Sequence, residues 1–242
     1  MTSLTEARAN FAARLFEMYP SFIPTQSIYL DLEGRKNGSE DILSLYWPVL
    51  TGSERFTWMR LTKTIPITLD GFLKHIESLR ASEAKWIIVF SGGQEEPDER
   101  NRLTDLLGKD PFIDRDWINL HHVVQKSQSL KRSIREHRNV WHCKDRSRVR
   151  YSLEALEWEF GIERPQHIRS HSNCYRDLAG GNGAMEVLSI SQRSKNGTAS
   201  DDEETSLKQY CEADVKNMFH IANTSERMVF SKTERSSRRS LH

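Results

Sequence analysis

The chain has 242 residues, with 35 basic and 34 acidic side chains and a formal net charge of +1. This balance argues against histone-like or tail-like nucleic-acid binders, because such chains carry a large excess of one charge. Hydrophobic residues make up 37% and charged residues 29%. The chain is therefore too apolar and too balanced for a disordered protein, and its length suits one sizeable domain or two small ones.

The sequence contains no segment that predicts membrane contact. Its longest clean apolar run, Trp86 to Phe90, is far shorter than the roughly 20 residues that a membrane helix needs. The N-terminus has no basic flank followed by an apolar segment, so no secretory signal is visible. Cys143, Cys174 and Cys211 form an odd, widely spaced set, which suits reduced thiols. We therefore expect a cytoplasmic protein with no membrane partner.

Taken in chain order, the hydrophobic pattern predicts an α/β protein. Strands are indicated by β-branched and aromatic runs, and helices by apolar residues at helical spacing. The connections between the first three strands are short enough for hairpins. We expect a 1–24 N-terminal helical extension, a 25–224 α/β domain and a 225–242 basic flexible tail. The predicted elements are helix 4–18, strands 27–34, 42–48 and 56–61, helix 69–79, strand 86–90, helix 97–107, strand 117–120, and helices 153–160 and 200–222.

Two carboxylates stand side by side on the first predicted strand. Because side chains alternate along a strand, Asp31 and Glu33 point to one face, and Leu30 and Leu32 point to the other. Two neighbouring acids in a largely apolar strand are unfavourable unless a positive charge offsets them. The pair therefore indicates either a functional site or an edge strand with a solvated face.

A third acid lies on the apolar side of the last long helix. At about 100° per residue, Asp214 falls within the stripe formed by Leu207, Cys211 and Met218. Tyr210 precedes it by one turn on the same side. An acid on a buried helix face needs a partner, which would be a ligand of a functional site, a nearby Arg or a backbone amide.

A further acidic group follows the predicted central strand, where ligands of α/β sheets gather. It comprises Glu95, Glu96 and Asp98 around Pro97. Acids in the first turn of a helix also serve as caps, so this group alone favours a cap. If the three acidic positions converge, however, their repulsion calls for divalent cations. Oxygen ligands of this kind suit Mg²⁺ or Mn²⁺, and two such ions about 3.5–4 Å apart promote phosphodiester hydrolysis.

At these positions the sequence resembles the DEDD superfamily of exonucleases, in the tyrosine-bearing branch. The segment 29–34, with Asp31 and Glu33, is similar to its DxE first motif, and 210–215, with Tyr210 and Asp214, is similar to its YxxxD third motif. The 151–162 segment resembles the helix between the second and third motifs. The closest likeness is to YprB-type ribonuclease-H-like domains, which are predicted 3′–5′ exonucleases related to the proofreading domains of DNA polymerases, and it runs from about Ser27 to Ala222.

This resemblance implies a ribonuclease-H-like mixed sheet, with three antiparallel strands followed by parallel strands and flanked by helices. It also implies that two ions, Mg²⁺ or Mn²⁺, are held by Asp31, Glu33 and Asp214 and that Tyr210 orients the attacking water. The second motif usually supplies an Asp, often after an Asn. Here Glu95, with Glu96 next to it, stands in that place, and Ser91 replaces the Asn.

A basic segment, 126–150, carries nine cations against two acids. Together with nearby aromatic residues it is typical of a channel for a single strand, where cations neutralise phosphates and rings stack on bases. A solvated helical face followed by a loop explains the same pattern. The candidate nucleic-acid contacts are Lys131, Arg132, Arg135, Arg138, Arg146 and Arg148.

These features together predict a metal-dependent 3′–5′ exonuclease that acts on the 3′ end of DNA or RNA by a two-metal mechanism. The substitutions at Ser91 and Glu95 motivate an alternative, a catalytically degenerate ribonuclease-H-like domain that binds nucleic acid or a protein partner. A third interpretation is an α/β domain in which these acids have only a structural role.

Overall fold

The computed structural model describes residues 3–33, 40–48, 55–62, 68–78, 84–91, 97–137, 151–164, 190, 192–194 and 196–240. Its described helices are α1 (Leu4–Met18), α2 (Leu69–Ser78), α3 (Asp98–Leu107), α4 (Leu120–Lys126), α5 (Gln128–Glu136), α6 (Leu153–Glu159), α8 (Asp201–Val229) and α9 (Lys232–Ser240), with a 3₁₀ turn at Pro24–Gln26. Its described strands are β1 (Ser27–Glu33), β2 (Glu40–Trp47), β3 (Arg55–Thr62), β4 (Trp86–Val89) and β5 (Asp116–Asn119).

The five strands form one mixed sheet in the order β3-β2-β1-β4-β5. β1 pairs with β2, and β2 with β3, in antiparallel registers that place Asp31 opposite Ser44. β4 then joins the other side of β1 in parallel, and β5 continues in parallel beside β4. The predicted α/β class, with three antiparallel strands followed by parallel strands between helices, is therefore confirmed.

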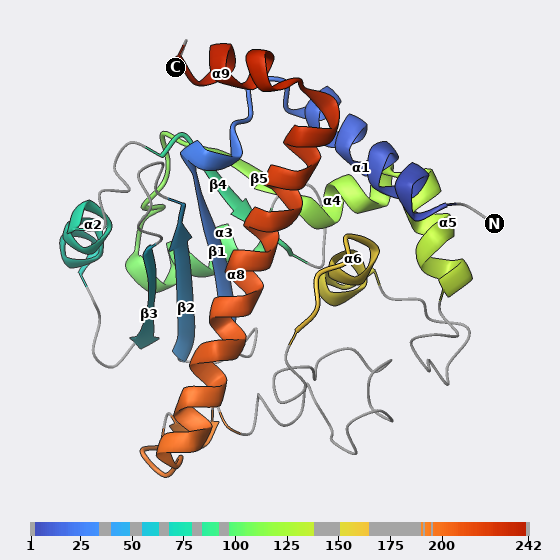
Figure 1. Ribbon diagram of the computed structural model, residues 1–242. Helices are drawn as coiled ribbons and strands as arrows, with labels where there is room; N and C mark the ends of the chain where they lie inside the picture. Colours follow the sequence, from blue (N-terminus) through green and yellow to red (C-terminus); the bar gives the residue numbers. More distant parts are fainter. Residues whose placement is uncertain are drawn as a thin grey trace.

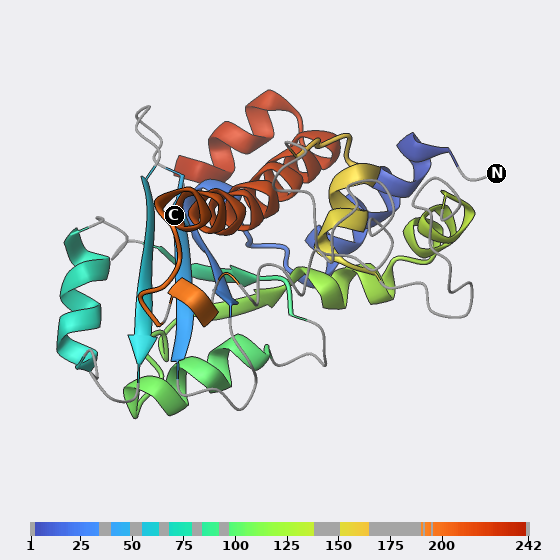
Figure 2. The ribbon, with the colours of Figure 1, turned by 90° about the horizontal axis from the view of Figure 1, so that it is seen from below.

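Alternation along β1 divides its side chains between the two faces of the sheet. Leu30 and Leu32 pack with Phe72 of α2 and Leu103 of α3 on one face. Tyr29 points to the other face, where its ring lies 5.6 Å from that of Phe219 in α8. Figure 2 shows α8 on one side of the sheet and α3 on the other. The long helix that carries Asp214 therefore covers the face opposite to α3.

The helix ends agree with several capping signals in the sequence. Ser200 and Glu203 form a reciprocal capping box at the start of α8. Ser152 caps α6 by accepting a bond from the amide of Ala155. Gly161 follows α6 with φ of 71°, a left-handed conformation that glycine adopts without strain. These caps set the ends of the two helices that carry Glu157 and Asp214.

The first and last described helices both pack against the rest of the protein. Phe11 and Leu15 of α1 are fully buried in the same core as α8, so this helix is part of the domain. α8 continues to Val229, and residues 232–240 form α9, which lies beside the end of α8 in Figure 1. Arg238 of α9 donates to the carbonyl of Phe22 and lies over the ring of Phe230. These contacts give a very polar segment a fixed place on the core.

Helix α4 follows the strand predicted at 117–120, where no helix was predicted, and α5 lies within the basic segment 126–150. Asn119 caps α4 by accepting from the amide of His121. Val124 and Leu130 are buried on the two helices, which explains why this charged region still packs on the domain. In the described part of the chain, no helix has both the length and the apolarity required to cross a bilayer.

Candidate functional site

Asp31 faces the interface between β1 and α8. It shares its side of the strand with Tyr29, which contacts Phe219. Further along the same face, Ile42, the register partner of Glu33, packs in one cluster with Tyr210. α8 therefore runs antiparallel to β1, and the turns of α8 between Tyr210 and Phe219 lie over Asp31. Asp214 belongs to these turns, so two acids 183 residues apart in the sequence share one interface.

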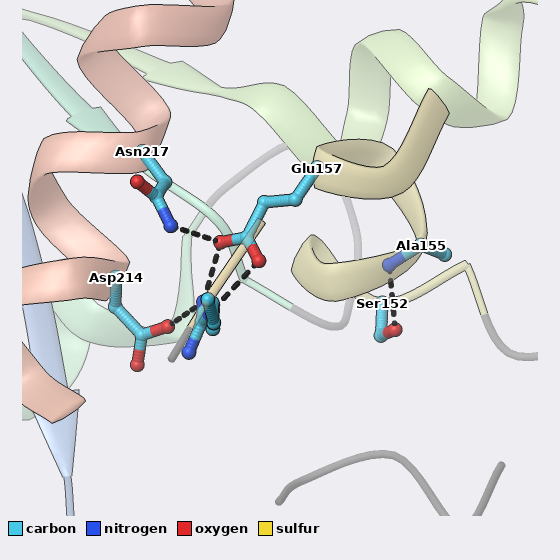
Figure 3. A network of polar contacts seen from close by, with 6 residues as sticks. Ser152, Ala155, Glu157, Asp214 and Asn217 are labelled. Carbon is cyan, nitrogen blue, oxygen red and sulfur yellow. Dashed lines mark hydrogen bonds and ion pairs between the residues drawn. The ribbon is translucent and has the colours of Figure 1, made fainter. Parts of the chain in front are cut away.

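The carboxylate of Asp214 is bonded to Arg164, which follows α6. The same guanidinium binds Glu157 of α6, with Nε of Arg164 donating to Oε2 of Glu157 at 2.6 Å and Nη2 donating to both Glu157 and Asp214. Asn217 of α8 donates to Glu157 Oε1 at 3.0 Å. Figure 3 shows Glu157, Asp214 and Asn217 converging between the two helices. This network joins α6 to α8 through one shared cation.

The network is almost wholly removed from solvent. Arg164 and Asp214 are each 5% exposed, and Glu157 is 2% exposed. Burial raises the pKa of Asp214, and the nearby Glu157 carboxylate raises it further, while Arg164 lowers it. Burial alone would lower the pKa of Arg164, but the two carboxylates outweigh it and keep the guanidinium charged. The two carboxylates therefore share one buried cation, Arg164.

Tyr210 lies one turn before Asp214 and is buried, with 8% of its surface exposed. Its hydroxyl donates to the Asp214 carboxylate, which lowers the pKa of Asp214 in opposition to burial. Its ring also lies 5.4 Å from the Arg164 guanidinium carbon. The predicted Tyr210–Asp214 pair is thus a direct contact, although its role toward a water molecule stays a prediction.

At the carboxyl ends of the parallel strands, β4 and β5 are joined by Asn119. Its side chain accepts from the Ser91 amide at 3.1 Å and donates to the Ser91 carbonyl at 3.2 Å. These two bonds tie the residue at the end of β5 to the backbone that follows β4. Glu95 and Glu96 lie outside the described residues, and so does the side chain of Glu33.

Glu99, in the first turn of α3, is an acid that the sequence analysis did not single out. It is 7% exposed, and its Oε2 atom is buried without a hydrogen-bond partner among the described residues. Burial raises its pKa, while a bond with Ser91 and the charge of Arg102 lower it. The one feature of the sequence that indicates burial of Glu99 is its position four residues before the core residue Leu103, on the same side of α3.

The donor chemistry at the β1–α8 interface suits a hard cation. Carboxylate oxygens, as on Asp31 and Asp214, are what Mg²⁺ and Mn²⁺ prefer. Within the described ranges, no group of three or more His, Cys, Asp or Glu residues is placed to hold a metal ion. Asp214 already pairs with the guanidinium of Arg164. A metal ion at Asp214 would therefore either share the carboxylate with Arg164 or take the place of Arg164.

The predicted nucleic-acid contacts are described only in part. Lys131, Arg132 and Arg135 lie on α5, which packs against α1, α4 and α6. Arg135 donates from Nε to the Tyr151 hydroxyl at 2.8 Å, so it is held beside an aromatic ring. Arg138, Arg146 and Arg148 lie outside the described part of the chain.

Comparisons of the chain with protein-family models, with curated proteins and with solved structures find no significant match.

Proposed function

We propose that the chain is a metal-dependent 3′–5′ exonuclease that hydrolyses phosphodiester bonds of DNA or RNA. The observation that supports this proposal is the position of Tyr210 and Asp214 on the helix that covers the Asp31 side of β1. The sheet order, with β4 and β5 parallel to β1, also brings the ends of these strands to one edge. Ligands of open α/β sheets bind outside such an edge.

The proposal gives each residue a distinct task. Asp31, Glu33, Glu95 and Asp214 would hold two ions, Mg²⁺ or Mn²⁺. These ions, when bound, lower the pKa of a water molecule and stabilise the departing oxygen. Tyr210, which is already bonded to Asp214, would orient the attacking water. The proposed partner is the 3′ end of a nucleic acid, and the proposed location is the cytoplasm.

A second candidate function is favoured by the ion pair between Arg164 and Asp214. A buried carboxylate that is neutralised by an internal guanidinium has less need of a metal ion. A ribonuclease-H-like domain that binds nucleic acid or a protein without cleaving it is consistent with this pair. The two candidates differ in whether any phosphodiester bond is broken.

The test is release of nucleotides from 3′-labelled single strands of DNA and RNA, with Mg²⁺ or Mn²⁺. The exonuclease proposal predicts release by the wild type and loss of release in Asp31→Ala and in EDTA. Asp70→Ala, at an exposed position of α2, is the matched control and keeps the wild-type rate. If wild type and Asp31→Ala release label at the same rate, the proposal fails. Binding of the strand without release supports the second candidate.

A further inference from the structure

A basic hollow lies where the end of α8 meets α9. It has a volume of about 400 Å³ and is lined by Arg227 of α8 and by Lys232, Arg235, Ser236 and Arg239 of α9. Four of these five residues are cations, and no acidic side chain is among them. Pockets for small organic ligands are lined mainly by apolar and aromatic side chains. The composition of this hollow instead favours an anionic ligand.

The cations of the basic hollow are only partly neutralised by the protein. Arg239 pairs with Glu226 at 2.9 Å, and Arg235 donates to the carbonyl of Phe230. Arg227 and Lys232 make no hydrogen bond or ion pair with any residue that the structure describes. Clustered like charges repel one another, so an anion that bridges them relieves this repulsion.

The acids nearest in sequence are occupied by other contacts. Glu226 is fully buried and faces Arg239. Glu234 accepts from the amide of Ser231 at 2.7 Å and so caps the start of α9. The charges of Arg227 and Lys232 are therefore left for a ligand from solution.

The basic hollow lies far from the candidate site along the same helix. Arg227 follows Asp214 by 13 residues in α8. At a rise of 1.5 Å per residue this is about 20 Å. Each strand of a nucleic-acid duplex carries one phosphate per about 3.4 Å of its length. A short stretch of nucleotides is therefore long enough to reach from Asp214 to Arg227. A polymer of phosphates fits both the charge of the hollow and its place beyond the site.

We propose that the basic hollow binds the phosphodiester backbone of nucleic acid. Arg227 supplies a planar fork of donors that matches a phosphate group, and Lys232 supplies a compact charge beside it. The Ser236 hydroxyl adds a donor. These contacts read charge and not base sequence, so they position a strand of any sequence. This binding does not depend on whether the β1–α8 interface cleaves the strand.

The experiment compares two double variants of the full chain. In Arg227→Gln/Lys232→Gln, two exposed cations of the basic hollow are lost. In Lys74→Gln/Lys109→Gln, two exposed cations elsewhere are lost, so the net charge changes equally. Circular dichroism checks that both variants fold. Fluorescence anisotropy with labelled 12-nucleotide DNA and RNA, in EDTA across a range of salt, measures binding without cleavage.

We expect Arg227→Gln/Lys232→Gln to bind about tenfold more weakly than wild type. The slope of log affinity against log salt concentration should fall in magnitude by about 1.4 for a single strand. The Lys74/Lys109 control stays within about twofold of wild type. Equal losses in both variants would overturn the proposal, because they would show a response to net charge alone. A wild type that binds neither strand would overturn it as well. Wild-type binding without nucleotide release leaves this inference standing while the exonuclease proposal fails.

Competition distinguishes a nucleic-acid backbone from other anions. Unlabelled oligonucleotide should displace the probe at a far lower phosphate concentration than inorganic phosphate does. If inorganic phosphate competes equally well, or if polyglutamate does, the assignment to nucleic acid is overturned.

Discussion

Arg164 and Asp214 form an ion pair inside the protein, and the same guanidinium also binds Glu157. Moving three charged groups out of water is expensive, and the cost is offset only when each charge keeps good hydrogen bonds. Asn217 and Tyr210 supply two of these bonds, to Glu157 and to Asp214. The pair therefore fixes α6 against α8 and sets the electrostatic state of the acid on which the proposed function depends.

Loss of Arg164 should strongly destabilise the protein. Arg164→Ala leaves two buried carboxylates without their cation, and breaking a buried pair in this way costs about 3–5 kcal/mol. The free energy of unfolding, measured by urea denaturation at pH 7, should fall by this amount.

Arg14→Ala is the matched control for this change. Arg14 pairs with Glu17 on the exposed side of α1 at 2.8 Å, with 39% and 66% of the two side chains exposed. Removal of such a surface pair costs about 0.2–1 kcal/mol. Equal effects of the two substitutions would show that the Arg164 network contributes no more than a surface pair.

Substitution of Tyr210 should change the pH dependence of the proposed reaction. The hydroxyl of Tyr210 lowers the pKa of Asp214 by donating to the ionised carboxylate. In Tyr210→Phe this pKa rises, so the acidic limb of the pH–rate profile moves to higher pH. The rate at pH 7 should also fall about 10²-fold if the water is misplaced. Tyr151→Phe, at a hydroxyl bonded to Arg135, serves as the control. An acidic limb that stays in place in Tyr210→Phe would contradict the role of this bond.

Glu99 should make stability depend on pH in a direction opposite to that of a paired acid. Burial raises its pKa in the folded protein, so folding favours the protonated carboxyl. Its contribution is fully present below the unfolded pKa, about 4.3, and is lost as pH rises through the folded pKa.

Glu99→Gln removes this loss because the amide does not ionise. The variant should have a higher Tm than wild type at pH 7, and the difference should shrink as the pH approaches about 4. Differential scanning calorimetry at several pH values measures this trend. A Tm difference that is the same at every pH would rule out ionisation of Glu99 as its cause.

The strands and the long helix were predictable because their signals are local. Alternation placed Asp31 on one face of β1, and the helical period placed Asp214 on the buried side of α8, where it is 5% exposed. Arg164 lies 50 residues before Asp214, outside any helix or strand, so no periodic pattern indicates their contact. The sequence was consistent with an Arg as the partner of Asp214, but it did not indicate which Arg.

Glu157 and α9 show where local signals fail. An acid on a short helix is usually solvated, but Glu157 is 2% exposed. Arg164, seven residues further on, and Asn217, 60 residues further on, both donate to its carboxylate. The charged composition of 232–240 is typical of a tail. Its helix is held by contacts of Arg238 with Phe22 and Phe230, which depend on the folded core.

In the proposed function, Asp31 and Asp214 belong to one metal-binding site on the β1–α8 interface. The most direct measurement is an anomalous difference map from crystals of the full chain with Mn²⁺ and a nucleoside monophosphate. We expect a manganese peak within coordination distance of both carboxylates, with Arg164 displaced from at least one oxygen of Asp214. A map at saturating Mn²⁺ with no peak at either carboxylate, and with Arg164 still bonded to Asp214, would contradict it.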